Sequence, residues 1–549
     1  MTIAGRRQGD WWTTAALAVC ALLAAAMRLY GWQEPVERDL AIHAVIGHEL
    51  LQGRELYSDL WDHKPPGTFL LHAAFVALFG YSPAYLYVMN VLLNVAGMLG
   101  IYVLVNALTG RRICGLAVAL LWVLVSDDIH LQANQPNSEA MAAPLLLFGA
   151  WCWYEVSERR RGPQWALLAG GLFFAATLLK QHYALMPAGM ATALLAHAAI
   201  KDRPALGAEL RTTLLIAGVG LAGWLLTLLA FWLQGSLDDF LDAVVTYNRG
   251  YGGDVLRTLK YAYRHWQNFF PTQFAAGLLP YIVTGVLAVA CMLWQRRWKL
   301  LFLFVAWVVA TELMVAVPGK FFPHYFQLWI PVMLVGVGLL LDSLLGWPAR
   351  AQGRGPALAM AVAVACLCLS GYRIAEQFTQ SAWRWAEIKY PTEHFGESRL
   401  LGESLAALLP AGSRVFFIGH DQQALFYGRL RPVNGKLYAR WLVDHPSLSP
   451  RLLADTNARF MAGGFDVAIV NASLVKLKAQ LIKEALSRDF VLAPDCFAHS
   501  EVWVRRGSAV EATVTAGLPG QSAGMLRSHG VPLDCARPGP TLVLGDNRR

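Results

Sequence analysis

The densest cluster of titratable side chains in the sequence lies between residues 34 and 67. The apolar spacing of Asp39–Leu51 predicts an amphipathic helix on a membrane surface, with a carboxylate at its N-terminal end. Lys64 precedes Pro65–Pro66, which fix the backbone without offering main-chain donors, so its ammonium is expected where a lipid phosphate would lie. Solvated ion pairs, such as Asp62 with Lys64, are the alternative interpretation.

A second set of carboxylates follows a short apolar stretch. Asp127 and Asp128 come directly after residues 113–126, and Glu139 lies a little further along. A helix over 113–126 would rise about 21 Å, short of the roughly 30 Å of bilayer hydrocarbon. We therefore infer a water-accessible cavity that opens outward, in which these carboxylates act or bind a divalent cation. Variation in loop depth is the alternative.

The histidines near these stretches do not form a metal-binding pattern. His130, His182 and His324 lack any recognised ligand spacing, so each is expected to be an interfacial residue with its hydrogen bonds satisfied. Walker, Rossmann and zinc motifs do not stand out either. We therefore expect a protein that requires no cofactor, while a divalent cation is neither indicated nor excluded.

The composition says which elements must position these residues. Of the 549 residues, 56% are apolar and 15% are charged, whereas soluble proteins have about 45–50% apolar and about 25% charged residues. The apolar surplus must therefore face lipid. Low charge excludes disorder, and eight cysteines with non-periodic Gly and Pro exclude a disulfide scaffold or a collagen.

Eleven apolar stretches predict an α-helical polytopic membrane protein. They are Trp11–Tyr30, Ala84–Leu108, Ile113–Ser126, Met141–Val156, Trp165–Leu179, Tyr183–Ile200, Leu214–Leu233, Phe274–Trp294, Leu300–Val317, Tyr325–Leu345 and Ala357–Tyr372. Alternate connections hold basic clusters at 6–7, 111–112, 159–161, 201–211, 296–299 and 350–354, whereas the opposite short connections hold only Lys180 and Lys320. Basic residues mark the cytoplasmic side, so the N terminus is expected inside. Much of the net charge of +9 is then a topology signal, which removes the case for a nucleic-acid partner.

Three elements are then expected outside: the first outer loop (31–83), the second outer loop (234–273) and everything after 372. In the second loop, tyrosines, a tryptophan and basic residues predict an interfacial helix that anchors the chain or gates access. Short β-rich runs alternating with helical stretches beyond about residue 398 predict a small α/β domain.

The predicted domains are therefore a transmembrane domain over 1–375, an extracytoplasmic α/β domain over 376–506 and a weakly ordered tail over 507–549. The strands are expected at Val415–Ile418, Asp466–Val470, Phe490–Leu492 and Val502–Arg505, and the helices at Leu400–Leu409 and Leu474–Leu486. Cys496 and Cys535 both fall outside, where an oxidising compartment would allow them to pair. The spacing leaves a paired and an unpaired state equally open.

The order of the motifs resembles that of the GT-C superfamily of membrane glycosyltransferases, in particular the bacterial relatives of protein O-mannosyltransferases and of the lipid A aminoarabinose transferase. The first outer loop of these proteins carries an Arg-Asp-Glu-like element, a Gly followed by Tyr-x-Asp, and an Asp-x-Lys-Pro-Pro element. The matching residues here are Arg38–Asp39, Gly53, Tyr57–Asp59 and Asp62–Gly67, followed by Pro136–Glu139, Lys180–Gln181, Tyr247–Asn248 and Phe321–Tyr325. The resemblance covers about residues 10–375.

The resemblance implies transfer of a sugar from a polyprenyl-phosphate-linked donor to an acceptor on the extracytoplasmic side of a bacterial inner membrane, with inversion. Asp39 matches the catalytic carboxylate that serves as general base or orients the acceptor, and Lys64 matches the lysine that contacts the donor phosphate. Leu40 stands where a Glu often follows the Asp. A second carboxylate, for which Asp127 and Asp128 are candidates, must then come from elsewhere, or the acceptor is bound differently.

The remaining expected site residues fall into two groups. Arg38, Lys180 and Lys320 are candidates for binding the donor phosphate beside Lys64, and the other candidates are Asp62, His63, Asp127, Asp128, Glu139, Tyr247 and His324. The expected partners are the lipid-linked donor, a lipid, glycan or protein acceptor, and membrane lipids. The sugar, the carrier length and the acceptor stay open.

Two other functions remain open at this point. A secondary transporter would also carry polar residues within its spans, but such proteins commonly show internal repeats with binding groups near the midplane. Here the charges gather in outer loops, which favours the transferase. A non-catalytic assembly factor that holds a partner through the outer domain is the third possibility.

Overall fold

A computed structural model describes residues 11–252, 260, 275–347, 354–474 and 476–529. The chain divides into two compact units. Unit 1 comprises residues 1–32, 87–230 and 252–381, and unit 2 comprises residues 33–86, 231–251 and 382–549. Unit 1 thus ends close to the predicted boundary at 375, while most of the first outer loop shares unit 2 with the C-terminal segment.

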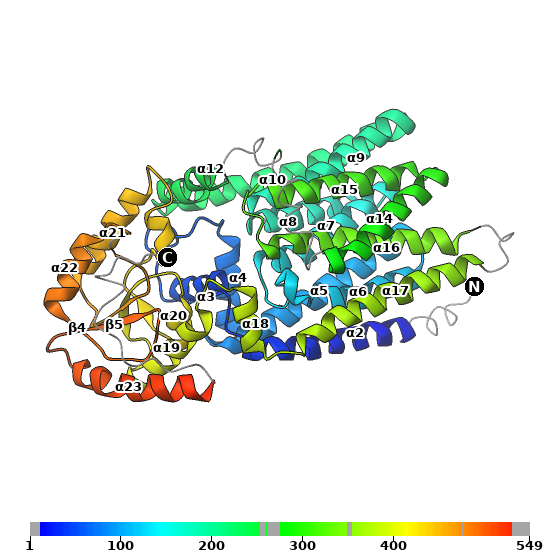
Figure 1. The fold of residues 1–549 in the computed structure, drawn as a ribbon. Coiled ribbons are helices and arrows are strands. Elements are labelled where there is room, and N and C mark those ends of the chain that lie inside the picture. The colour runs from blue at the N-terminus through cyan, green and yellow to red at the C-terminus, as the bar shows by residue number, and fades with distance from the viewer. Residues whose placement is uncertain (1–10, 253–259, 261–274, 348–353, 475, 530–549) are drawn as a thin grey trace. The chain divides into compact units, whose positions relative to one another are not determined.

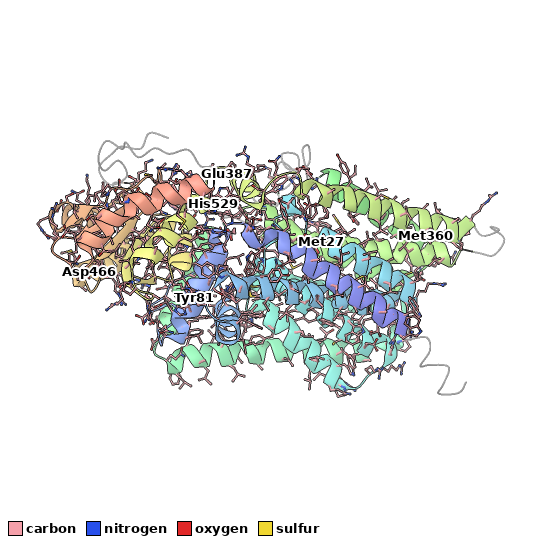
Figure 2. All side chains as sticks on the ribbon, turned by 90° about the horizontal axis from the view of Figure 1, so that it is seen from below. Met27, Tyr81, Met360, Glu387, Asp466 and His529 are labelled. Atoms are coloured by element: carbon pink, nitrogen blue, oxygen red, sulfur yellow. The ribbon has the colours of Figure 1, made fainter. Side chains whose placement is uncertain are left out.

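Unit 1 is a bundle of long apolar helices that run side by side (Figure 1). The helices are α2 (Trp11–Tyr30), α5 (Pro83–Thr109), α6 (Arg112–Val125), α7 (Ser138–Arg159), α8 (Pro163–Thr177), α9 (Leu185–Lys201), α10 (Leu206–Leu233), α14 (Ala275–Trp294), α15 (Trp298–Ala316), α16 (Trp329–Leu345) and α17 (Arg354–Gln377). Each of the eleven predicted spans therefore coincides with one of these helices over most of its described residues. Met27 of α2 and Met360 of α17 mark two of these helices in Figure 2.

Seven helices in the described part of the chain are long and apolar enough to cross a membrane: Trp11–Gln33, Pro83–Thr109, Gln181–Lys201, Arg203–Leu233, Trp298–Ala316, Pro323–Leu345 and Arg354–Gln377. Three shorter helices, Gly67–Phe79, Arg112–Val125 and Leu278–Trp294, are also apolar. The chain is a multi-pass membrane protein. The count of seven is smaller than the predicted eleven partly because α6 and α8 have only 14 and 15 residues.

Burial within unit 1 distinguishes a central helix from a peripheral one. Every residue of α16 from Ile330 to Leu344 is buried, and α16 packs against α6, α14 and α17. By contrast, α10 leaves Leu214, Leu221 and Leu225 exposed. Leucine rows on an outer face are expected where lipid is the solvent.

Ion pairs at one end of unit 1 join several of the predicted basic connections. Asp342 accepts hydrogen bonds from Arg111 at 2.8 Å and from Arg297 at 2.6 Å. Lys299 lies 3.2 Å from Glu209 and also pairs with Glu158. These basic residues therefore lie on the same side of the bundle, as their sequence pattern predicts.

In unit 2, the first outer loop folds into two helices, α3 (Arg38–Leu51) and α4 (Gly67–Phe79). The helix predicted over 39–51 is confirmed, but the expectation of one exposed face is wrong, because every residue from Leu40 to Gly47 is buried. The reason is that α3 packs against both α4 and α20 (Gln423–Gly428). A Cβ on Gly47 would lie 2.8 Å from the backbone nitrogen of Ala73, so glycine allows this close packing.

The C-terminal part of unit 2 is an α/β structure built on a five-stranded sheet of order β2-β1-β3-β5-β4. The strands are β1 (Arg414–Ile418), β2 (Arg431–Pro432), β3 (Val467–Val470), β4 (Phe490–Leu492) and β5 (Glu501–Arg505). β1 pairs in parallel with β2 and β3, whereas β5 runs antiparallel to β3 and β4. Four of these strands were predicted, and only the two-residue β2 was not.

The helices of this part are α18 (Ala382–Lys389), α19 (Phe395–Leu408), α20, α21 (Ser449–Ala462), α22 (Gln480–Asp489) and α23 (Glu511–Ser528). α19 packs against α20 and α23, and α21 packs against α22. The second outer loop adds α11 (Leu237–Leu241), a π-helix η5 (Asp242–Tyr247) and α12 (Asn248–Tyr251). Short 3-10 helices cover Gly31–Gln33, Ile129–Leu131, Gln181–Ala184, Arg203–Ala205, Pro323–Leu328 and Ala439–Leu442.

The tail from residue 507 contains α23, which corrects the expectation of a weakly ordered segment. Val514, Leu518, Ser522 and Leu526 are buried at spacings of four residues, and this stripe packs against α19. Residues 530–549 lie outside the described residues, as do 253–259 and 261–274 of the predicted interfacial helix. Cys496 is disulfide-bonded, and Cys535 lies outside the described residues.

Candidate active site

Asp39 is placed by the N-terminal cap of α3. The Glu37 carboxylate oxygen Oε2 accepts hydrogen bonds from the backbone nitrogens of Asp39 at 2.8 Å and Leu40 at 3.3 Å. This cap satisfies donors that a helix start leaves without intrahelical partners. Burial, reinforced by the charge of Asp39, raises the pKa of Glu37 from 4.5 to about 8. The neutral form of Glu37 is therefore favoured beside Asp39.

Lys64 lies directly against Asp39. Its Nζ is 3.1 Å from Asp39 Oδ2 and 3.9 Å from Asp62 Oδ1. The side chain of Lys64 is 9% exposed. Although burial lowers the pKa of Lys64, Asp39 and Asp62 oppose that effect and hold it above its ordinary value. The site therefore contains a charged ammonium next to an accessible carboxylate, since the side chain of Asp39 is 31% exposed.

Two contacts hold the backbone at Lys64. The Tyr57 hydroxyl donates to the Lys64 carbonyl oxygen at 2.8 Å, and the Lys64 backbone nitrogen donates to Asp62 Oδ1 at 3.0 Å. Asp62 itself is fully buried, and its Oδ2 has no hydrogen-bond partner among the described residues. Burial raises the pKa of Asp62, while Lys64 opposes that rise.

Arg38 faces the other side of Asp39. Its Nε lies 3.6 Å from Asp39 Oδ1, and its Nη1 donates to Glu393 Oε1 at 2.9 Å. The guanidinium carbon is 4.7 Å from the centroid of the Tyr438 ring, a cation–π contact. Arg38 is therefore held by residues far along the chain from the first outer loop.

Aromatic residues of the second outer loop lie beside His63. The His63 carbonyl oxygen accepts a hydrogen bond from Asn248 Nδ2 at 2.6 Å. The centroid of the His63 ring lies 5.4 Å from that of the Tyr247 ring and 4.9 Å from that of the Tyr251 ring. Unit 2 thus brings together six of the predicted site residues: Arg38, Asp39, Asp62, His63, Lys64 and Tyr247.

The other predicted site residues belong to unit 1, where several form ion pairs of their own. Lys180 Nζ lies 2.5 Å from Glu139 Oε1 and 4.6 Å from the ring centroid of Tyr325. His324 Nδ1 is within 3.1 Å of Gln132 Oε1. Lys320 is exposed.

The carboxylates of Asp127 and Asp128 hold helices of unit 1 together. Asp127 pairs with Arg28 of α2 and accepts a hydrogen bond from Gln377 of α17 at 3.2 Å. Asp128 pairs with Arg373 of α17 at 3.0 Å. Their geometry is that of links between helices.

Three residues around Asp39 did not emerge from the sequence: Glu37, Glu393 and Tyr438. Glu37 precedes the predicted helix by two residues, so a search for capping side chains could have found it, although Glu is not among the preferred capping residues. Glu393 and Tyr438 follow no recognisable local motif. In the described part of the chain, no group of three or more His, Cys, Asp or Glu residues could hold a metal ion.

Comparison with known proteins gives a family match over part of the chain and a shared fold over most of it. Residues 63–228 match the family described as dolichyl-phosphate-mannose-protein mannosyltransferase. ArnT from Cupriavidus metallidurans, solved with bound undecaprenyl phosphate, is similar over 90% of this chain and 98% of its own, with 13% identity and a TM-score of 0.56.

The archaeal oligosaccharyltransferase AglB from Archaeoglobus fulgidus, solved with an inhibitory peptide and a dolichol-phosphate, is similar over 93% of this chain and 78% of its own. Its identity is 11% and its TM-score 0.52. No curated protein matches the chain significantly. The chain thus resembles a mannosyltransferase family over residues 63–228 and shares its fold with two membrane proteins solved with bound lipid phosphates.

Proposed function

We propose that this chain transfers a sugar from a polyprenyl-phosphate-linked donor to an acceptor hydroxyl on the extracytoplasmic side of a bacterial inner membrane, with inversion at the anomeric carbon. The observation that carries the proposal is the contact between Lys64 and Asp39, in which a buried ammonium lies 3.1 Å from a carboxylate at a helix start. Undecaprenyl phosphate and dolichol-phosphate bound to the similar structures support a lipid-phosphate donor.

The two side chains have complementary tasks in such a transfer. Asp39 takes the proton of the acceptor hydroxyl while that oxygen forms a bond to the anomeric carbon from the face opposite the phosphate. The bond between the anomeric carbon and the phosphate oxygen breaks, and Lys64 neutralises the charge on the departing lipid phosphate. The proton ends on Asp39, so atoms and charges balance.

Donor binding would also activate the base. Asp39 is the carboxylate nearest to Lys64, at 3.1 Å against 3.9 Å for Asp62. A phosphate at Lys64 competes for the same ammonium, which weakens the hold on Asp39 and leaves its oxygen able to accept a proton. Asp62 stays behind Lys64, where its buried charge keeps the ammonium oriented.

The remaining details of the proposal follow from the same chemistry. The donor lipid and a lipid, glycan or protein acceptor are the substrates, and the transfer proceeds without a metal ion. Lys180 and Lys320 stay candidates for contacts to donor phosphate. Dialysis against EDTA should therefore leave turnover unchanged, and a loss restored only by a divalent cation would contradict the metal-free proposal.

The test uses the full chain purified into lipid nanodiscs with a panel of undecaprenyl-phosphate sugars and envelope glycolipids as acceptors. Asp39→Asn removes the base and should lower kcat by about 10²–10⁴-fold. Lys64→Gln removes the phosphate partner and should lower kcat/KM by about 10²–10³-fold. Glu55→Gln is the matched control, because Glu55 is an exposed acid of the same loop.

Two outcomes would contradict the proposal. One is full turnover in both Asp39→Asn and Lys64→Gln, with the melting temperatures of both variants close to the parent value. The other is a glycan product that retains the donor's anomeric configuration, read by NMR.

A further inference from the structure

The C-terminal α/β part of unit 2 is tied to the first outer loop by the close fit of two backbones. A Cβ on Gly435 would lie 1.5 Å from the carbonyl oxygen of Asp59, so only glycine fits at this contact. The Trp61 backbone nitrogen donates to the Gly435 carbonyl oxygen at 3.1 Å. The segment that leads into Asp62 and Lys64 therefore rests directly on the α/β part.

Ion pairs along the same contact add to this fit. Arg431 makes a two-pronged pair with Glu49, at 2.9 and 3.1 Å, and Glu49 is 2% exposed. Arg54 donates to the Pro432 carbonyl oxygen at 2.7 Å. Two-pronged arginine–carboxylate pairs fix orientation as well as distance. This pair therefore holds α3 in one orientation relative to the sheet.

Asp39 lies between two cations that come from different directions. Lys64 contacts its Oδ2, and Arg38 Nε lies 3.6 Å from its Oδ1. Each carboxylate oxygen thus faces its own cation, an arrangement that favours one rotation of the carboxyl group. When Lys64 turns to a phosphate, Arg38 still holds that rotation.

The position of Arg38 depends in turn on two residues of the α/β part. Glu393 accepts its Nη1 hydrogen bond at 2.9 Å, and the Tyr438 ring lies 4.7 Å from its guanidinium carbon. The Arg38 side chain is 16% exposed, so little water competes for it. The hydrogen bond to Glu393 and the ring contact with Tyr438 together restrict the guanidinium, so it has little freedom to move away from Asp39.

We propose that Glu393 and Tyr438 are positioning residues for the transfer: they hold Arg38 beside Asp39, and the α/β part is thereby a working component of the active site. This inference rests on the proposed function of Asp39. Neither residue touches a reacting atom, so both act through Arg38.

The first test is a double-mutant cycle on the full chain in nanodiscs. Glu393→Gln should lower kcat about 10-fold and leave the donor KM within about two-fold, since small misplacements of a catalytic group are costly. In the Arg38→Gln background, Glu393→Gln should change kcat less than about two-fold, because its only path to the reaction is already lost. An equal loss in both backgrounds, or no loss in the parent, would overturn the proposal.

The ring contact is tested by two substitutions of Tyr438. Tyr438→Phe keeps the ring face and should retain turnover within about two-fold, whereas Tyr438→Leu removes the face and should lower kcat about five-fold or more. Loss of turnover in Tyr438→Phe equal to that in Tyr438→Leu would contradict a role through the ring.

A readout that needs no turnover separates this inference from the proposed function. Phenylglyoxal modification of Arg38, followed by mass spectrometry, should be faster in Glu393→Gln than in the parent by about five-fold, since the guanidinium loses its carboxylate partner. The matched control is Glu387→Gln on α18, an exposed acid labelled in Figure 2, which should leave the rate unchanged.

The two failures have different signatures. A parent chain that transfers no sugar from any lipid-phosphate donor refutes the proposed function, whatever the labelling rates. Labelling of Arg38 in Glu393→Gln at the parent rate overturns the positioning role, even if the parent is active.

Discussion

Three buried carboxylates of unit 1 and the carboxyl groups around Asp39 in unit 2 are arranged in different ways. In unit 1 three buried carboxylates each have a basic partner: Asp127 pairs with Arg28, Asp128 with Arg373 and Glu139 with Lys180. In unit 2 the carboxyl groups around Asp39 outnumber the cations, because Glu37, Asp39, Asp62 and Glu393 surround Arg38 and Lys64.

This difference separates charges that hold helices together from charged groups whose pKa values are shifted. In a one-to-one pair each charge is stabilised by its partner, so both groups stay in their charged forms. An excess of acids in a buried cluster disfavours their charged forms, as the raised pKa values of Glu37 and Asp62 indicate. Shifted titration in one cluster is typical of functional sites.

The largest expected effect separates activity from stability at Asp39. Asp39→Asn should lower turnover by about 10²–10⁴-fold while the melting temperature stays within a few degrees, because Asn keeps the volume and one oxygen near Lys64. Turnover is measured with the lipid-linked donor, and melting by tryptophan fluorescence of the same preparation. A large drop in melting temperature with normal specific turnover would show that Asp39 has a structural role, like the ion pairs between the helices of unit 1.

The second expected effect concerns the pair between Arg28 and Asp127. Arg28→Met leaves a buried carboxylate unpaired and should cost about 3–5 kcal/mol in the free energy of unfolding, whereas Arg28→Met with Asp127→Leu should recover most of that loss. Unfolding by SDS titration in mixed micelles measures both. If the double variant is as unstable as the single one, the pair does more than balance charge.

The third prediction uses the raised pKa of Glu37. The folded pKa of about 8 lies above the ordinary value of 4.5, so the folded protein binds the proton more tightly than the unfolded chain. The Glu37 contribution to stability is present below about 4.5 and is lost as pH rises towards 8. Glu37→Gln keeps a capping oxygen and removes this loss, so its melting temperature relative to the parent should increase between pH 5 and pH 8. A constant difference across that range would refute the shift.

The smallest effect is expected at an exposed pair of α18. Arg384 and Glu387 form an ion pair with side chains 60% and 48% exposed. Arg384→Ala should change the free energy of unfolding by less than about 1 kcal/mol, because water screens such pairs. A change comparable to that of Arg28→Met would remove the distinction between buried and surface charges.

The sequence predicted the helices well and the site only in part. All eleven predicted spans coincide with helices over most of their described residues, because long apolar stretches determine their own conformation in lipid. α4 was missed because its 13 residues are too few to span a membrane and lie inside a presumed loop. Short elements such as β2 and α20 depend on packing against other elements. The local sequence pattern carries no signal of that packing.

Within the site, the predicted residues were those carried by ordered motifs in one loop. Asp39, Asp62 and Lys64 lie within 25 residues of one another, and the fold brings their side chains into contact. Glu393 contacts Arg38 across a separation of 355 residues. No periodicity or spacing in a single sequence encodes such a pairing, since it depends on how the two chain segments dock.

The same separation sets an order of events during synthesis. At about 5–20 residues per second, Glu393 is translated roughly 20–70 s after Arg38. During that interval Arg38, at the start of α3, lacks its partner Glu393. Asp59 also lacks Gly435, against which its backbone later packs. The contacts around Asp39 can therefore be complete only once the chain has been translated beyond residue 438, late in synthesis.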